Sequence, residues 1–325
     1  MPRPFGSRPR ARGPLALRAL AAALFGLPAL TAGPAALAAA PAGPETAATA
    51  VGAVGARAAD AYWTAGRMAA ALPAAGGRRA AGPAGAGRVP PGRPFDGIPQ
   101  VGTFFWTDGT GTGRFCGGTV VRSPHRDLVV SAAHCLLSPD PRRRLSFVPR
   151  YHDGLKPHGV FPVEKIHIDR RYRELGTGRG ARWDYTVVRL GPRADGTRVE
   201  SAVGGFRLAA GPGFTHRRVR LIGYPGNSDS THPKPLDCLS STRRYTSTDP
   251  GAPGDFLEIP CAGYVGGTSG GPFLVRERGG YALIGVIGGY HTGGDTPDVS
   301  YSSYFTGDLT ALFRRAVRDD PATAP

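Results

Sequence analysis

The sequence predicts an all-β fold built from many short strands. From Phe95 onward, short apolar runs recur between clusters of glycine, proline and aspartate that favour turns. These runs cover residues 101–105, 118–121, 128–131, 160–168, 186–190, 219–222, 256–259, 272–275, 281–287 and 299–305. Long helical patterns, which would alternate with strands in a βαβ fold, are missing until the end of the chain. Residues 95–325 suffice for one large all-β domain or for two fused barrels.

One amphipathic helix is predicted near the C-terminal end. Its apolar residues recur at helical spacing and share one face: Leu309, Leu312, Phe313, Ala316 and Val317. Asp308 stands where a helix N-cap is expected. Arginines at 314, 315 and 318 point outward and lie towards the C-terminal end, where they complement the helix dipole. The sequence therefore predicts that a helix packed on a β body closes the fold.

The first forty residues have the pattern of a secretory signal peptide. Five arginines precede or enter an apolar run over residues 15–30, and small residues follow up to Ala40. A membrane anchor is the competing interpretation, but Pro28 and Pro34 interrupt a run shorter than the roughly 20 residues needed to span. We expect cleavage between Ala32 and Ala40, a secreted, extracellular protein, and no membrane association after cleavage.

Residues 41–94 are predicted to form a pro-segment or linker that is mostly disordered. The segment consists largely of alanine, glycine, proline and arginine, so it offers little apolar surface to offset the entropy of ordering. One short helix over residues 56–72, with Tyr62, Trp63 and Met68, is the alternative for part of it.

The net charge of +16 is shared between two parts of the chain. Residues 1–92 hold 10 basic and 2 acidic side chains, so half of the excess lies in segments predicted to be removed or disordered. The other half is scattered over polar loops. This distribution favours a solvated basic surface over adhesion to an acidic one, and we expect no nucleic-acid partner.

Four cysteines occur: Cys116, Cys135, Cys238 and Cys261. An even number in a secreted chain predicts two disulfides, and four cysteines allow three connectivities. Zinc is the rival interpretation, but no pair has Cys-x-x-Cys spacing. We therefore expect disulfides, no metal site and no cofactor.

The stretch Gly-Gly-Thr-Ser-Gly-Gly-Pro over residues 266–272 offers a candidate nucleophile. Glycines on both sides allow a tight turn that exposes the Ser269 hydroxyl. If the amides of Gly267 and Ser269 point to one place, they form an oxyanion site beside the serine, as acyl transfer requires. By itself, this stretch is explained equally well as a flexible glycine loop.

Two further motifs place a base and an acid at strand ends. The run Leu-Val-Val-Ser-Ala-Ala-His-Cys ends in His134, and Trp-Asp-Tyr-Thr-Val-Val-Arg-Leu places Asp184 before a buried strand. A carboxylate in that position needs hydrogen-bond donors, and a histidine N–H is a suitable one. His134, Asp184 and Ser269 follow one of the known chain orders of a catalytic triad.

These three motifs together resemble the trypsin/chymotrypsin-like serine peptidases, and most of all their secreted bacterial trypsin-like members. The resemblance covers residues 101–317. It implies a pair of six-stranded antiparallel β-barrels, over residues 95–203 and 204–325, with the active site in the cleft between them. It also implies a serine endopeptidase that acts on protein or peptide substrates, and we expect a monomer.

The resemblance assigns a role to each of the motif residues. Ser269 would attack the peptide carbonyl, His134 would transfer the proton, and Asp184 would orient the imidazole. The oxyanion would lie against the amides of Gly267 and Ser269. The resemblance also implies disulfides between Cys116 and Cys135 and between Cys238 and Cys261.

The chain departs from the family pattern in three places. Thr268 stands where digestive members carry an aspartate, and no Ile-Val-Gly-Gly start occurs near Ile98. Both departures argue against activation by a new amino terminus that pairs with that aspartate. Gly288 replaces a serine that bonds the catalytic aspartate in many members, so Asp184 requires support from elsewhere.

The candidate substrate-binding residues are Gly263, Gly288, Gly289, Tyr290 and Asp298. Gly263 lies six residues before Ser269, where trypsin-type members hold the acid that selects arginine or lysine. Asp298 matches a pocket-wall position and is a candidate substitute, although an ordinary turn aspartate explains it equally well. The strand at Gly288, Gly289 and Tyr290 is expected to pair with the substrate backbone.

Two other functions compete with this prediction. Residues 267–271 also fit the Gly-x-Ser-x-Gly elbow of α/β-hydrolases, which requires an acid and then a histidine after the serine. Only Glu277 and His291 are available for that order, and the β-rich pattern disfavours that fold. The second rival is a catalytically silent, peptidase-like binding module, against which the complete triad argues.

Overall fold

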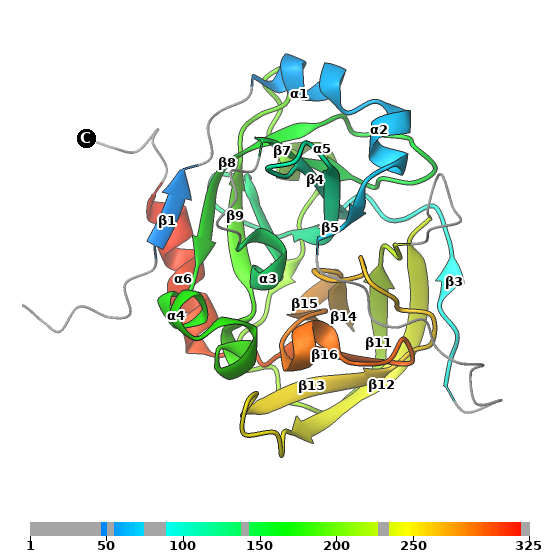
Figure 1. Cartoon of the computed structure of the whole chain (residues 1–325), viewed down its shortest axis with the longest axis vertical. Coiled ribbons are helices and arrows are strands. Elements are labelled where there is room, and N and C mark those ends of the chain that lie inside the picture. Colours follow the sequence, from blue (N-terminus) through cyan, green and yellow to red (C-terminus); the bar gives the residue numbers. More distant parts are fainter. Residues whose placement is uncertain (1–46, 51–54, 75–88, 138–142, 227–233, 320–325) are drawn as a thin grey trace, which may run out of the picture. The chain divides into compact units, whose positions relative to one another are not determined.

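The computed structural model describes residues 47–50, 55–74, 89–137, 143–226 and 234–319 (Figure 1). The predicted signal peptide lies outside these residues. Within them, no helix is both long enough and apolar enough to cross a membrane. The predicted all-β class is confirmed, since two eight-stranded sheets form the body of the fold and the helices are few.

The first sheet closes into a six-stranded barrel. Its hydrogen-bonded order runs β8-β7-β4-β5-β6-β9, and β9 pairs back to β8. The strands are β4 (Val101–Thr107), β5 (Gly113–Val120), β6 (Leu128–Ser131), β7 (Arg143–Pro149), β8 (Phe161–Ile168) and β9 (Thr186–Leu190). Two short strands are added to it: β1 (Ala47–Ala50) on β8 and β2 (Leu72–Pro73) on β5.

The second sheet supplies the other half of the fold. Its order is β10-β15-β14-β11-β12-β13-β16, and β3 pairs with β12. The strands are β3 (Arg93–Pro94), β10 (Arg207–Leu208), β11 (His216–Gly223), β12 (Leu236–Thr246), β13 (Asp255–Pro260), β14 (Pro272–Glu277), β15 (Gly280–Val286) and β16 (Val299–Ser303). The end strand β16 also contacts β15 across the sheet, where the Val286 N–H donates to Ser302 Oγ at 2.9 Å.

Apolar strand residues fill the interior of the first barrel. Every residue of β4 is buried, and the rings of Phe104 and Phe147 lie 4.9 Å apart between centroids. Glycine is required where β5 crosses this pair, because a Cβ on Gly118 would lie 2.6 Å from the Phe104 ring. This dense packing fixes β5 and β6, which lead directly to the candidate site.

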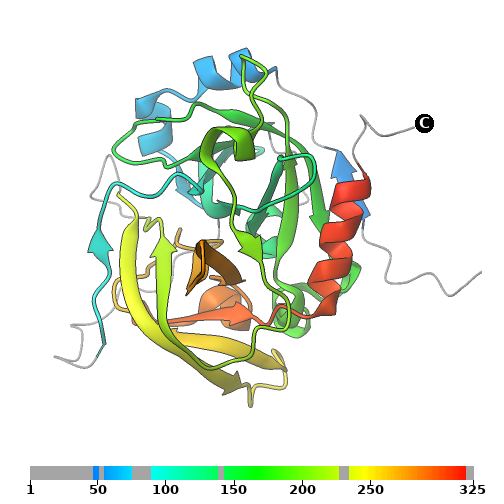
Figure 2. The ribbon, with the colours of Figure 1, turned by 180° about the vertical axis from the view of Figure 1, so that it is seen from behind.

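The predicted C-terminal helix is present as α6 (Gly307–Arg318). Leu309, Leu312 and Ala316 are buried, as predicted. The cap differs from the prediction, because Thr306 is the N-cap and its hydroxyl accepts the Asp308 N–H at 3.2 Å. Although α6 follows the second sheet in sequence, it packs on β8 and β9 of the first (Figure 2).

The remaining helices are short connections. They are α3 (Ala133–Leu136), α4 (Arg170–Arg179), α5 (Val199–Val203), and the 3₁₀ turns η1 (Ala181–Trp183) and η2 (Tyr290–Gly293). Between Phe95 and the C-terminal helix, the sequence predicted no helix. Helix α4 was not predicted because its ten residues are mostly polar and form no apolar stripe. Of these residues, only Tyr172 is buried.

Part of the segment predicted to be mostly disordered is folded in the structure. Residues 55–74 form α1 (Ala56–Tyr62), α2 (Ala65–Ala69) and β2. The physical reason is tertiary: Trp63 and Met68 are 1% and 2% exposed because they pack on the first barrel. The alternative of a helix near Tyr62, Trp63 and Met68 describes these residues better than the expectation of disorder.

Candidate active site

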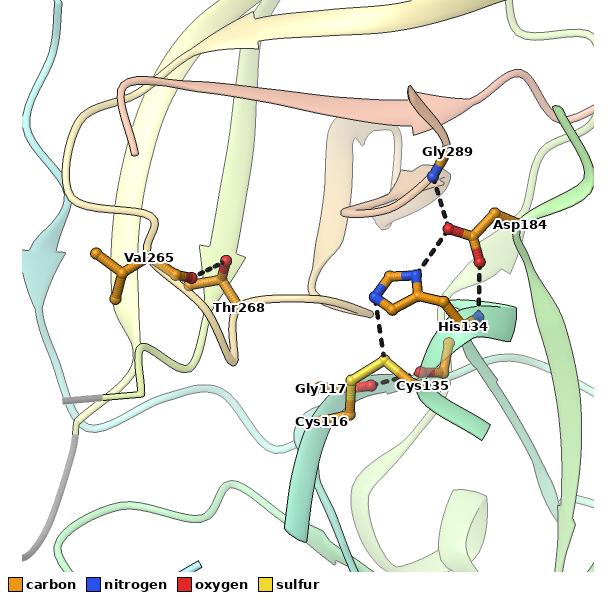
Figure 3. Close-up of a disulfide and its surroundings, with 9 residues drawn as sticks. Cys116, Gly117, His134, Cys135, Asp184, Val265, Thr268 and Gly289 are labelled. Carbon is orange, nitrogen blue, oxygen red and sulfur yellow. Dashed lines mark hydrogen bonds and ion pairs between the residues drawn. A yellow bond between two sulfur atoms is a disulfide. The ribbon is translucent and has the colours of Figure 1, made fainter. Parts of the chain in front are cut away.

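His134 and Asp184 form a buried hydrogen-bonded pair. His134 Nδ1 lies 2.7 Å from Asp184 Oδ2, and the two side chains are 2% and 1% exposed (Figure 3). The His134 backbone N–H also donates to Asp184 Oδ1 at 2.8 Å. Strand β6 ends at Ser131 and α3 begins at Ala133, so the imidazole stands at the start of a short helix. Because Nδ1 is hydrogen-bonded to the carboxylate, Nε2 is the ring nitrogen left to act as a base.

Asp184 receives a third hydrogen bond from the second half of the fold. The Gly289 N–H donates to Asp184 Oδ2 at 2.8 Å (Figure 3). The neighbouring Gly288 leaves no space for a larger side chain, because a Cβ there would lie 3.0 Å from the same carboxylate oxygen. A backbone amide therefore supports Asp184 where many relatives use a serine.

Ser269 is tied to the first barrel through its backbone. The Gly117 N–H donates to the Ser269 carbonyl at 2.7 Å, and Ser131 Oγ donates to the Gly117 carbonyl at 2.7 Å. Gly270 must be glycine here, since its φ is +77° and a Cβ would lie 2.2 Å from the Gly117 oxygen. Sequence reasoning missed Gly117 and Ser131, although Gly117 directly follows Cys116.

The same contacts place the backbone of Ser269 next to the disulfide that borders the His134 imidazole. Gly117 adjoins Cys116, whose disulfide to Cys135 lies beside the imidazole, with Cys135 Sγ 3.8 Å from His134 Nε2. Within the described residues, no hydrogen bond joins the Ser269 hydroxyl to Nε2. In free enzymes that bond is often long and shortens when substrate binds. Ser269 is largely buried, with 9% of the residue exposed.

The candidate oxyanion site consists of two amides without partners. In the nucleophile loop, the N–H groups of Thr268, Gly270 and Gly271 are hydrogen-bonded to carbonyls. Those of Gly267 and Ser269 have no hydrogen-bond acceptor within the described residues. Gly267 has φ of +93°, a conformation that glycine adopts without strain. Two amides without acceptors beside a serine can serve as the donors of an oxyanion site.

Thr268 holds the nucleophile loop in place. Its hydroxyl donates to the Val265 carbonyl at 2.8 Å, and it is 1% exposed. Gly223, at the end of β11, packs directly against it, because a Cβ there would lie 2.8 Å from Thr268 Cβ. The loop is thus shaped by Thr268 itself, without the aspartate of digestive relatives.

The two disulfides have the predicted partners. Cys116 pairs with Cys135 across 19 residues, and Cys238 pairs with Cys261 across 23. The thiols near His134 are therefore oxidised and offer no thiolate ligand to a metal. The second bond connects β12 to the chain immediately before the nucleophile loop.

The candidate substrate-binding residues surround this loop. Gly263, with φ of +91°, lies in the turn that follows β13, and Asp298 is partly exposed, with its carbonyl accepting the Cys261 N–H at 2.9 Å. Gly288 and Gly289 are buried beside Asp184. Tyr290 is half-buried and follows them.

An aromatic cluster that the sequence analysis missed fixes Tyr290. The rings of Tyr245, Phe256 and Tyr301 lie 4.8, 5.8 and 5.2 Å from the Tyr290 ring. These residues come from β12, β13 and β16, so only the folded sheet brings them together. Period-two patterns in the separate strands contain no signal of this cluster.

His291 connects two loops next to Tyr290. Its Nδ1 lies 2.8 Å from Asp295 and its Nε2 lies 3.1 Å from Asp249. Partial burial lowers the pKa of His291, but hydrogen bonds to Asp295 and Asp249 outweigh this effect and raise the pKa above its ordinary value. The loop that carries Tyr290 is thereby tied to the turn between β12 and β13.

Comparisons with known proteins agree with this fold. The sequence pattern of the family described as Trypsin matches residues 98–305. The chain therefore belongs to the trypsin family, and it is a serine-type endopeptidase. The search against curated proteins found no match.

Solved structures of similar fold include three proteases. The thermostable serine protease AL20 from an extremophilic microorganism has a TM-score of 0.57 and 24% identity, over 68% of this chain and 98% of its own. The protease Anisep from Arthrobacter nicotinovorans has a TM-score of 0.59 and 20% identity, over 70% and 100%. A Glu endopeptidase has a TM-score of 0.51 and 15% identity, over 72% of this chain and 99% of its own.

Proposed function

We propose that this chain is a secreted serine endopeptidase in which His134, Asp184 and Ser269 form the catalytic triad. The observation that carries the proposal is the buried His134–Asp184 pair, joined by the Cys116–Cys135 disulfide and Gly117 to the backbone of Ser269. The substrates are proteins or peptides, in line with the family.

The geometry supports an acyl-enzyme mechanism. Ser269 Oγ attacks the substrate carbonyl while His134 Nε2 accepts its proton, and Asp184 stabilises the imidazolium through Nδ1. The tetrahedral oxyanion receives hydrogen bonds from the free amides of Gly267 and Ser269. His134 then gives the proton to the leaving amine. Water repeats the sequence on the acyl-enzyme, and Ser269 is regenerated.

Secretion is proposed from the sequence and from cysteine usage. Residues 1–40 have the pattern of a signal peptide. All four cysteines are paired in the structure, as expected for a protein that folds in an oxidising compartment.

The test is proteolysis by the purified protein and by Ser269→Ala. We expect the variant to keep the free energy of unfolding of the parent and to lose activity on a generic protein substrate by at least about 10⁴-fold. Ser241→Ala, on an exposed position of β12, is the matched control and should retain full activity. If Ser269→Ala retains activity, the nucleophile is a different residue.

A further inference from the structure

A short extended segment lies against the strand that carries Cys116. The segment is Leu72–Pro73 (β2) followed by Ala74, and we call these three residues the strap. β2 runs parallel to β5, with Leu72 opposite Arg114 and Pro73 opposite Phe115. The Ala74 N–H donates to the Phe115 carbonyl at 3.0 Å. The strap therefore uses the backbone acceptor directly before the catalytic disulfide.

The helices before the strap hold it in place. Trp63 packs on the Phe105 ring at 5.4 Å, and its Nε1 donates to the Arg144 carbonyl at 2.9 Å. Ala59 and Met68 are buried in the same core. Because α1 and α2 are anchored to the first barrel at several points, the strap reaches Phe115 without losing much further entropy.

The strap also contacts the loops that shape the nucleophile turn. A Cβ on Gly226 would lie 2.3 Å from Pro73 Cγ, so Pro73 rests on the backbone of Gly226. The Gly226 N–H in turn donates to the Gly266 carbonyl at 2.6 Å. A Cβ on Gly267 would lie 2.6 Å from the Phe115 ring. Gly226 and Phe115 therefore lie between the strap and the loop that carries the candidate oxyanion site.

The direction of a bound substrate follows from the proposed function. Its acyl side pairs with residues 288–290, which lie beside Asp184. Figure 3 shows Gly289 on one side of the His134 ring and Cys116 with Gly117 on the other. The residues after the cleaved bond must therefore leave past the disulfide, along Phe115. The carbonyl that such residues would use is already occupied by Ala74.

We propose that the strap is an autoinhibitory element that fills the leaving-group side of the substrate cleft. This inference rests on the proposed function. It makes the full chain a poor enzyme for peptides that extend beyond the cleaved bond. Substrates that end at that bond, such as chromogenic anilides, do not need Phe115 and escape the inhibition.

The test compares two substrates with the same acyl side. One is an anilide, and the other is a peptide with three further residues after the cleaved bond. Ala74→Pro removes the N–H that Phe115 accepts, and Ala74→Gly, the matched control, keeps it. We expect Ala74→Pro to raise kcat/KM on the extended peptide roughly tenfold, the equivalent of one hydrogen bond, with less than about a twofold change on the anilide. Ala74→Gly should leave both values near those of the parent.

Trp63→Ala gives an independent measurement, because it weakens the anchoring helices instead of the strap. The same selective gain on the extended peptide is expected. The proposal is wrong if kcat/KM falls on both substrates together as the melting temperature falls. It is also wrong if the ratio of kcat/KM on the two substrates stays constant in both variants, because the strap then only stabilises the fold.

Labelling with a fluorophosphonate separates this proposal from the function on which it rests. A label on Ser269 in every variant, with an unchanged substrate ratio, overturns the strap alone. The absence of any label on folded protein overturns the proposed function, and the strap proposal falls with it.

Discussion

At the scale of single residues, the site depends on how Asp184 is satisfied. Three donors reach its carboxylate: the imidazole and backbone N–H of His134, and the N–H of Gly289. A buried carboxylate remains charged only when it is supported in this way. The bond from Gly289 also joins the two halves of the fold at the catalytic residues.

Asp184→Asn tests this role. An amide can place its NH₂ against His134 and stabilise the wrong tautomer, so the proton moves to Nε2, where the base is needed. We expect kcat to fall by about 10⁴-fold near neutral pH, with little change in folding. Steady-state kinetics on an anilide substrate measure the loss. A decrease of less than tenfold would show that Asp184 does not orient the base.

His167, a buried histidine that lies outside the candidate active site, makes the stability of the fold depend on pH. Its side chain is fully buried, and burial lowers its pKa to about 4. In the unfolded chain its pKa is near 6.5. As the pH falls from 6.5 towards 4, the unfolded state therefore takes up a proton that the folded state refuses, and stability is lost.

His167→Leu should remove this part of the acid sensitivity. Between pH 7 and pH 5 we expect the parent to lose about 2 kcal/mol more of its free energy of unfolding than the variant loses. Urea unfolding at both pH values gives the two differences directly. Equal losses in parent and variant would mean that His167 is protonated in the folded protein.

At the scale of elements, Arg189 fastens the C-terminal helix to the first barrel. It lies on β9, is 1% exposed, and forms an ion pair with Asp127, which is equally buried. Its other guanidinium nitrogen donates to the Ala316 carbonyl in the last turns of α6. One buried side chain therefore satisfies a carboxylate and a helix terminus together.

Arg189→Leu should destabilise the protein strongly. It removes the buried cationic partner of Asp127 and leaves the half-exposed Arg198, 3.1 Å away. We expect the free energy of unfolding to fall by about 3 kcal/mol, measured by denaturant titration. Arg198→Leu is the control, and its loss should stay below about 1 kcal/mol. Comparable losses in the two variants would contradict the assigned role of Arg189.

The elements also show how far sequence reasoning reaches. Strands such as β4, β6 and β9 were predictable because their apolar runs end at turn residues. A helix over residues 56–72 was only the alternative to disorder, because an alanine-rich segment offers few apolar side chains, and the order of Trp63 depends on contacts with Phe105 and Arg144 of the first barrel. The cap of α6 was misplaced by two residues, since Thr306 and Asp308 are both good caps.

At the scale of the whole molecule, the site exists only where the two sheets meet. The sequence motifs predicted which residues to combine, because each motif lies at a strand end. They could not predict that Gly289 replaces a missing serine, or that Gly117 and Ser131 hold Ser269. The contacts of Gly289 with Asp184 and of Gly117 with Ser269 join residues more than one hundred positions apart, and glycine backbone amides make them without any side-chain signature.

The central claim is that Ser269 is a nucleophile activated by His134. Peptide mapping by mass spectrometry after treatment with diisopropyl fluorophosphate measures this most directly. The account predicts one phosphoryl adduct, on Ser269, with labelling slowed at least about 10³-fold in His134→Ala. An adduct on another serine, or equal labelling rates in the parent and in His134→Ala, would contradict it.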